Sequence, residues 1–265
     1  MRRKLTDFFV VTFLLFVATL YALYIPQNII WGKSVICGFI YLAPSIIYLG
    51  LRAKKNWRKI FVFSLVFGAL FGFIFEFIAQ YNKAYAVIST LTPYKFLGVL
   101  PLDNIIGHFM MATMTFVFYE HFIEQKIGAK ISKRINHAIF LGLGISILII
   151  VLFLLHLLPH ISYPYLVMGT LAILFPLSLA ITQPRFIKNM SMMAIFFFFL
   201  YLLMEVVAVH NSWWIYPGGE YVGWVDFLGS HFPIEELLFW MLFYAATLIS
   251  FYEYCMDISF STKGK

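Results

Sequence analysis

Residues 137–158 read HAIFLGLGISILIIVLFLLHLL and contain no Asp, Glu, Lys or Arg. A helix of about 20 such residues crosses the roughly 30 Å hydrocarbon core of a bilayer. The whole chain is 62% hydrophobic and only 12% charged, against roughly 25% charged in a soluble domain. Seven further apolar blocks lie at residues 8–25, 34–51, 60–80, 102–122, 163–182, 191–210 and 233–252. We therefore predict an all-α integral membrane protein with eight transmembrane helices.

Basic residues gather at alternate ends of these blocks. Of the 19 Lys and Arg residues, only Lys33, Lys83 and Lys95 lie on one side. The others are Arg2, Arg3, Lys4, Arg52, Lys54, Lys55, Arg58, Lys59, Lys126, Lys130, Lys133, Arg134, Arg185, Lys188, Lys263 and Lys265. The positive-inside rule then places both termini in the cytoplasm, with the helices in the cell membrane. The net charge of +7 indicates contact with lipid headgroups rather than with nucleic acid.

The two halves of the sequence carry similar short motifs at the ends and starts of corresponding apolar blocks. Residues 76–82 read EFIAQYN and residues 205–211 read EVVAVHN, each at the end of an apolar block. The next block opens with PLDN at 101–104 in the first half and with PIEE at 233–236 in the second. This indicates a duplicated unit with repeats at 1–133 and 134–265. Each repeat has four spans, so both are expected to insert the same way up and to enclose a central cleft.

Five carboxylates are expected at one level in this cleft, and charged groups in hydrocarbon are costly enough to require a reason. They are Glu76, Asp103, Glu205, Glu235 and Glu236. Asn104 and His108 share a helix face, as do Glu236 and Trp240. The alternative readings are ordinary: an acid after a proline suits any helix start, and a histidine on an apolar face is commonly a packing residue.

Other sequence features limit the kinds of reaction that we expect of the protein. The sequence has no dinucleotide or phosphate-loop fingerprint and no pair of aspartate-rich motifs, so we predict no cofactor and no metal site. Cys37 and Cys255 are interpreted as small apolar fillers. Glu120, Glu124 and Glu253 lie near the basic ends of their blocks and are expected to pair with basic residues there.

The second half resembles the small membrane-embedded lycopene cyclases, which occur as two half-size subunits or as fused halves. The resemblance covers the tandem architecture and about 60 residues in which aromatic residues precede a Pro-x-Glu-Glu motif. The residues that carry it are Asn211, Trp213, Trp214, Tyr216, Gly223, Pro233, Glu235, Glu236, Phe239 and Trp240. The first half departs from the pattern, because Asp103-Asn104 stands in place of Glu-Glu and Gly107-His108 in place of Phe-Trp.

The resemblance implies a cofactor-free, acid-initiated cyclisation of the end group of a linear C40 polyene such as lycopene. It implies a catalytic set of Glu235, Glu236, Glu205 and Asp103, in which a buried, protonated acid starts the reaction. It also implies a substrate-binding set of Glu76, Asn104, His108, Asn211, Trp213, Trp214, Phe239 and Trp240, whose aromatic faces stabilise a carbocation. Glu205, Asp103 and His108 all remain open as the base.

Two other functions remain open from the sequence. A small parallel-repeat transporter or proton/cation channel would use Glu76, Glu205 and Asp103 as an ion path, with Pro44 and Pro176 interrupting two spans. The second alternative is a purely structural subunit, whose role would require none of the five carboxylates. The expected partners are the polyene substrate and membrane lipid, with a second copy of the chain or other carotenoid enzymes left open.

Overall fold

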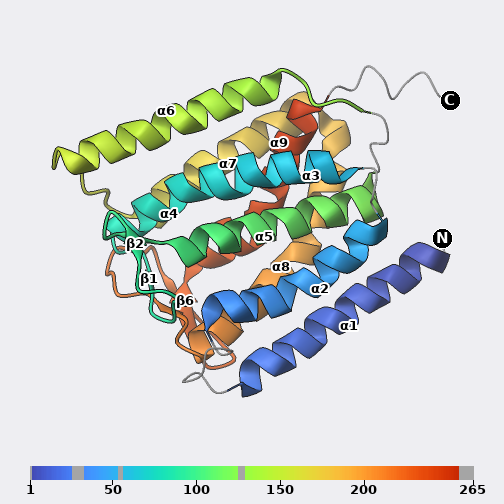
Figure 1. Ribbon diagram of the computed structural model, residues 1–265, viewed down its shortest axis with the longest axis horizontal. Coiled ribbons are helices and arrows are strands. Elements are labelled where there is room, and N and C mark those ends of the chain that lie inside the picture. Colours follow the sequence, from blue (N-terminus) through green and yellow to red (C-terminus); the bar gives the residue numbers. More distant parts are fainter. Residues whose placement is uncertain (1, 26–32, 53–55, 125–128, 257–265) are drawn as a thin grey trace.

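The structure is a computed structural model that describes residues 2–25, 33–52, 56–124 and 129–256, and it is 74% helical. Five residues used in the topology prediction, Lys54, Lys55, Lys126, Lys263 and Lys265, lie outside the described residues. Within the described part, eight helical segments run along the molecule (Figure 1). The all-α prediction is therefore confirmed.

Most segments match the predicted apolar blocks to within four residues at each end, whereas α1 begins six residues earlier and η5 with α8 seven residues earlier than predicted. They are α1 (Arg2–Tyr24), α2 (Ser34–Arg52), α3 with η3 and α4 (Trp57–Phe63, Ser64–Leu70 and Phe71–Tyr81), α5 with η4 (Leu102–Phe118 and Tyr119–Ile123), α6 (Arg134–Leu154), α7 (Pro164–Thr182), η5 with α8 (Pro184–Phe186 and Ile187–His210), and η6 with α9 (Glu236–Phe243 and Tyr244–Cys255). The η3, η4 and η6 segments are π-helical, and η5 is a 3₁₀ turn.

Seven of these helices, in the portion of the chain that the structure describes, are long and apolar enough to cross a membrane. Large apolar side chains point outward from several of them, including Phe140 at 72% and Ile181 at 80% exposure. Such a surface suits lipid rather than water. The fold is that of a multi-pass membrane protein.

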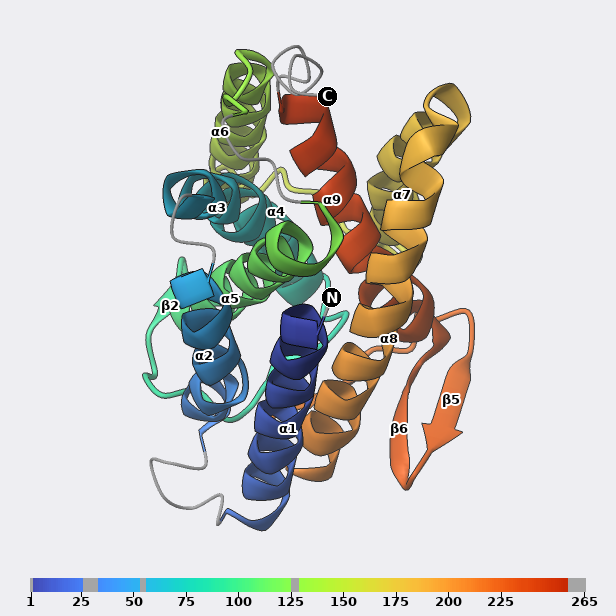
Figure 2. The ribbon, with the colours of Figure 1, turned by 90° about the vertical axis from the view of Figure 1, so that its right-hand side faces the viewer.

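The helix outside this set of seven is α5, which carries Asp103, Asn104 and His108. It lies in the middle of the bundle, surrounded by α2, α3, α8 and α9 (Figure 2). From Met110 to Phe118 every residue of α5 is buried. Because neighbouring helices screen it from lipid, α5 tolerates polar residues that an outer helix would not.

Short strand pairs gather at one end of the molecule, called here the loop end (Figure 1). They are β1 (Ala86–Val87) with β4 (Trp214–Ile215), β2 (Lys95–Phe96) with β3 (Leu100–Pro101), and β5 (Trp224–Phe227) with β6 (Ser230–Pro233). The opposite end, called the termini end, holds the start of α1 and the end of α9. Both hairpins turn through a Leu-Gly pair with positive φ, Leu97-Gly98 and Leu228-Gly229.

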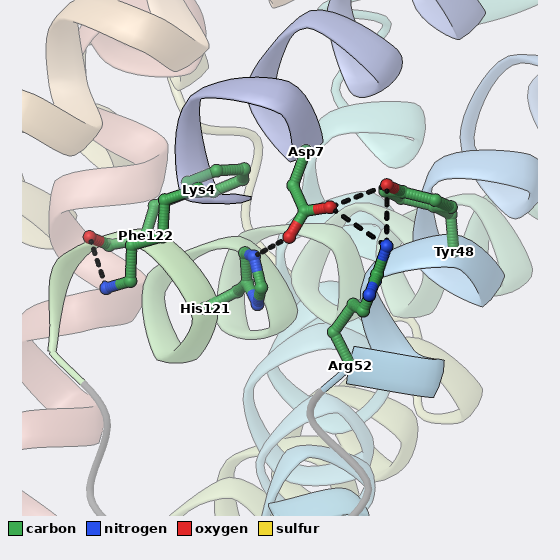
Figure 3. Close-up of polar contacts among 6 residues, drawn as sticks. All are labelled: Lys4, Asp7, Tyr48, Arg52, His121 and Phe122. Carbon is green, nitrogen blue, oxygen red and sulfur yellow. Dashed lines mark hydrogen bonds and ion pairs between the residues drawn. The ribbon is translucent and has the colours of Figure 1, made fainter. Parts of the chain in front are cut away.

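A buried ion cluster joins α1 to the bundle at the termini end (Figure 3). Asp7 is 0% exposed and accepts a hydrogen bond from the Tyr48 hydroxyl at 2.6 Å. Its carboxylate also lies 3.2 Å from the Arg52 guanidinium and 2.9 Å from His121 Nε2. Asp7 thus connects α1 with α2 and η4, a role that its place near a helix start did not indicate.

A second polar cluster at the termini end links α5–η4 to α9 by reciprocal contacts. The Tyr119 hydroxyl donates to Glu253, and the Tyr252 hydroxyl donates to Glu120. Asn56 Nδ2 also donates to Glu120 at 2.5 Å. Glu120 is 0% and Glu253 1% exposed, so these acids are core residues rather than rim residues.

The expected basic partners of these acids are only part of the cluster. Lys59 Nζ lies 3.7 Å from Glu120, whereas Glu124 accepts a hydrogen bond from Asn189 at 2.9 Å. The buried carboxylates therefore accept hydrogen bonds from phenol and amide groups in addition to the ion pair between Lys59 and Glu120. The sequence did not indicate this, because the partners are 64 to 134 residues apart in the chain.

Replacing Asp7 with Asn should lower the melting temperature in detergent by about 5 to 10 °C, since a buried ion pair loses one charge while Arg52 and His121 keep their places. Lys4→Gln on the same helix is the control, because Lys4 is exposed and makes only a 3.4 Å contact with the Phe122 carbonyl. Equal melting temperatures for wild type and Asp7→Asn would show that the cluster does not hold α1.

Candidate functional site

A cavity of about 120 Å³ lies toward the loop end, between α2, α4, α5, α7, α8 and η6. Its polar lining residues are Ser34, Glu76, Tyr85, Asp103, Asn104, His108, Tyr165, Glu205, Trp214, Glu236 and Trp240. Its apolar lining residues are Val35, Gly38, Leu42, Phe75, Val87, Gly107, Met110, Met111 and Met204. Eight of the twelve residues proposed from the sequence line this one space.

The first wall of the cavity centres on Glu76 of α4. Glu76 Oε1 lies 2.5 Å from His108 Nε2, and Oε2 accepts a hydrogen bond from Asn104 Nδ2 at 2.6 Å. The Tyr85 hydroxyl donates to the same oxygen. Asn104 and His108 therefore reach Glu76 together, as their shared helix face predicts.

Two glycines bring α5 close enough for these contacts. A Cβ at Gly68 would lie 2.7 Å from Ala112, and one at Gly72 would lie 2.9 Å from His108. Any larger residue would therefore push α5 away from η3 and α4. The close approach fixes the His108 ring beside Glu76.

The facing wall centres on Glu205 of α8. Glu205 Oε1 accepts a hydrogen bond from Trp214 Nε1 at 3.1 Å and another from the Tyr216 hydroxyl at 2.5 Å. Burial raises the pKa of the Tyr216 and Tyr85 phenols well above the usual 10, so each hydroxyl keeps its proton and acts as a donor. Loop aromatics thus satisfy both helix carboxylates.

Glu236 lies between the two walls in η6. It is 7% exposed, and its carboxylate lies within electrostatic reach of both Glu205 and Glu76. Tyr165 of α7 and Tyr216 stand beside it. Glu76, Glu205 and Glu236 therefore share one cavity.

Aromatic rings form the cavity wall next to these acids. The Trp240 ring centre is 5.1 Å from His108, 5.7 Å from Tyr201 and 4.4 Å from Tyr244. These contacts hold the indole at the cavity lining in a fixed orientation. The π-helical turn η6 presents Glu236 and Trp240 together, and such turns are frequent at functional sites.

Asp103 and Glu235 serve the outer loops instead. Asp103 Oδ2 accepts a hydrogen bond from the Leu91 backbone N–H at 2.5 Å, and Glu235 Oε1 accepts one from the Val222 N–H at 2.6 Å. Asp103 also reaches the cavity lining, whereas Glu235 does not. Both residues therefore tie a loop to the start of a helix.

The structure places three other proposed residues outside the cavity lining. Asn211 Nδ2 donates to the Ala22 carbonyl at 2.7 Å, and Trp213 packs against Ala22 and Cys37. The Phe239 ring meets α7, where a Cβ at Gly169 would lie 2.1 Å away. Asn211 and Trp213 thus hold α1 against the end of α8, and Phe239 packs η6 against α7.

Three tyrosines of the site received no site role from the sequence. Tyr85 was not singled out, and Tyr216 entered only among the aromatic residues that carry the resemblance. Their nine- and eleven-residue distances from Glu76 and Glu205 were the usable signal. Tyr165 gave none, because it reaches the cavity from α7 only through tertiary packing. Its ring contacts Tyr85 and Tyr216, with centres 6.2 and 6.4 Å apart.

The arrangement can exchange protons. No three His, Cys, Asp or Glu side chains of the described residues come close enough to hold an ion. The cavity instead combines carboxylates, an imidazole and aromatic faces in an apolar surrounding.

No protein-family model, curated protein or solved structure matches this chain. Function has to be inferred from the cavity itself.

Replacing Glu235 with Ala should speed amide exchange at Val222 by about tenfold or more, because a hydrogen bond to a charged acceptor is lost. Glu235→Gln is the matched control, since its side-chain carbonyl can still accept from the Val222 N–H. Hydrogen exchange with mass spectrometry of a peptide covering residues 217–224 measures both. Unchanged exchange in Glu235→Ala would mean that Glu235 does not hold this loop.

Proposed function

We propose that the protein is a carotenoid cyclase that closes the end group of a linear C40 polyene of the lycopene type by acid catalysis. The observation that carries the proposal is the cavity in which Glu76, Glu205 and Glu236 meet His108 and the ring of Trp240. An acid, a base and a surface for a cation are what such a reaction needs. The sequence resemblance points to the same reaction.

Glu236 is the proposed acid. Carboxylates that share a dry cavity retain a proton more readily than isolated ones, since two like charges at short range are costly. The Glu236 O–H would transfer its proton to one carbon of the terminal alkene and leave a tertiary cation on the other. The electron pair of a second alkene then closes a six-membered ring and moves the positive charge into it.

Aromatic faces around the cavity would stabilise this cation. Each well-placed, desolvated face contributes about 1 to 2 kcal/mol. Trp240 and Trp214 both line the cavity, one beside His108 and the other bound to Glu205. Their apolar surfaces also exclude water, which would otherwise add to the cation and give an alcohol.

The His108–Glu76 pair is the proposed base. A neutral imidazole can take the ring proton next to the cationic carbon, which sets the final double bond. Glu76, 2.5 Å from Nε2, orients the ring and stabilises the imidazolium that forms. One proton enters the product and one leaves, so substrate and product are isomers and no cofactor is consumed.

The cavity volume is of the order of a single small ring. An apolar cavity of roughly 150 Å³ is known to admit a six-carbon ring such as benzene. The volume here is about 120 Å³, which is comparable. A polyene dissolved in the bilayer would place only its terminus in this space.

Tandem duplication would explain why matching contacts recur in the two halves. Ala86 pairs with Ile215, and Lys83 and Ser212 share the same positive φ. The Leu91–Asp103 and Val222–Glu235 hydrogen bonds also correspond. We propose repeats at 1–133 and 134–265 that face each other across the cavity.

The termini end is proposed to face the cytoplasm of a cell membrane. Arg52, Arg134 and Arg185 lie at helix ends there, whereas Lys83 and Lys95 lie at the loop end. This distribution supports the orientation through the positive-inside rule.

A transport path through the bundle is less well supported than a closed site. Between the cavity and the acids at the termini end, aromatic rings pack along α5. Phe116 and Tyr252 are 5.3 Å apart between centres, and Phe63 is 4.5 Å from Tyr252. These rings fill the space that a continuous ion path would need.

Expression in cells that accumulate lycopene tests the proposed reaction. Wild type should convert the acyclic pigment to a ringed isomer, and Glu236→Gln should reduce the rate at least about 100-fold because the acid is lost. The adjacent Glu235→Gln, whose side chain still binds the loop, should retain most of the activity. Chromatography of extracted pigment separates the isomers.

Two outcomes would contradict the proposal. The first is unchanged lycopene in the presence of well-folded wild-type protein. The second is equal loss of activity in both glutamine variants, which would remove the distinction between the proton donor and the loop-binding residue.

The proposed duplication is tested by dividing the chain between residues 127 and 128. Coexpressed halves should associate, copurify and convert pigment at a rate within about tenfold of the intact chain, because α5 and α9 meet through buried reciprocal contacts. Affinity capture through a tag on one half measures the association. Two halves that each insert but never copurify would contradict it.

A further inference from the structure

Helix glycines in this protein fall into two groups by what surrounds them. A Cβ at Gly50, Gly68, Gly72, Gly142 or Gly169 would meet another atom closer than 3.0 Å, so these glycines allow close packing. A Cβ at Gly38, Gly107 or Gly144 would meet nothing within 4 Å. The second group has no packing reason to be glycine.

Two members of this second group line the cavity. Gly38 of α2 and Gly107 of α5 both border it, whereas Gly144 is exposed on the outer helix α6. Glycine within a helix is less stable than alanine at the same place. At Gly38 and Gly107, unlike at Gly144, the open space in front of the glycine belongs to the cavity.

The two glycines stand at similar depths. Gly38 lies one turn into α2 from Ser34, and Gly107 lies one turn into α5 from Asp103 and Asn104. Beyond them, one further turn along, the lining is Leu42 on α2 and Met111 on α5. Gly38 therefore stands between Ser34 and Leu42 on α2, and Gly107 between Asn104 and Met111 on α5, among the residues that line the cavity.

The cavity lining combines polar and apolar groups. Glu76, Glu236 and His108 border the same space as Leu42, Met110, Met111 and Met204. Methionine side chains are flexible and adapt to irregular apolar shapes. A guest suited to this lining is an apolar chain end that lies beside the acids.

We infer that Gly38 and Gly107 keep the cavity open for the methyl-branched end of an apolar chain, and that they determine how large a guest the cavity accepts. This chain end lies beside Glu236 and His108, in front of the two glycines. The inference rests on the proposed function for the identity of the guest, but its test does not depend on conversion.

The test measures the amount of C40 pigment that copurifies with the protein from a lycopene-producing host in mild detergent. Gly38→Leu and Gly107→Leu should each retain at least about fivefold less pigment per protein than wild type, because the added side chain occupies the guest's space. Gly144→Leu is the matched control, open but remote from the cavity, and should retain as much as wild type.

Gly38→Ala and Gly107→Ala provide a second measurement that remains informative if the leucine variants misfold. Each should raise the melting temperature by about 2 °C through better helix propensity and yet lower pigment retention. A purely structural glycine would not give opposite changes in stability and retention. A fall in both quantities would overturn the inference.

The outcomes separate the inference from the proposed reaction. Pigment that is retained by wild type but never cyclised would refute the reaction and leave the inference standing. Cyclisation with undiminished retention in the leucine variants would overturn the inference alone. Wild-type protein that is folded but holds no C40 pigment would overturn it as well.

Discussion

Burying a carboxylate among apolar helices is costly unless hydrogen-bond donors reach it, and this constraint shapes both ends of the molecule. At the loop end, Glu76 and Glu205 receive donors from aromatic residues of the outer loops. At the termini end, Glu120 and Glu253 receive phenol donors from each other's helices. The donors come from distant parts of the chain, so these hydrogen bonds form only when the helices of the bundle have assembled.

The surroundings of the buried acids differ between the two ends. Glu120 is 0% exposed and is held by Tyr252, Asn56 and Lys59. Glu236 instead borders a cavity and lies close to two other carboxylates. Acids of the first kind hold helices together. Acids of the second kind can exchange a proton with a guest, which is why the proposed chemistry belongs at the loop end.

Much of the fold could be predicted because lipid imposes a simple rule on sequence. Apolar blocks of the right length gave most of the helices to within a few residues, and the i, i+4 spacing gave the shared face of Asn104 and His108. The tertiary partners could not be predicted in this way. The sequence did not single out Asp7, because its burial depends on Tyr48 and Arg52 of another helix. Phe239 stands next to Trp240 in the chain but points toward α7, because neighbouring helical residues face about 100° apart.

The central claim is that an exchangeable proton held in the cavity starts ring closure on an apolar guest. Membranes containing the protein can be incubated with lycopene in D₂O and the cyclic product analysed by mass spectrometry. Protonation by an exchangeable acid predicts one deuterium in the product for each ring formed, since one proton enters from the acid and another leaves to the base. A cyclic product without deuterium would contradict the account, and so would lycopene that stays acyclic while the protein is folded.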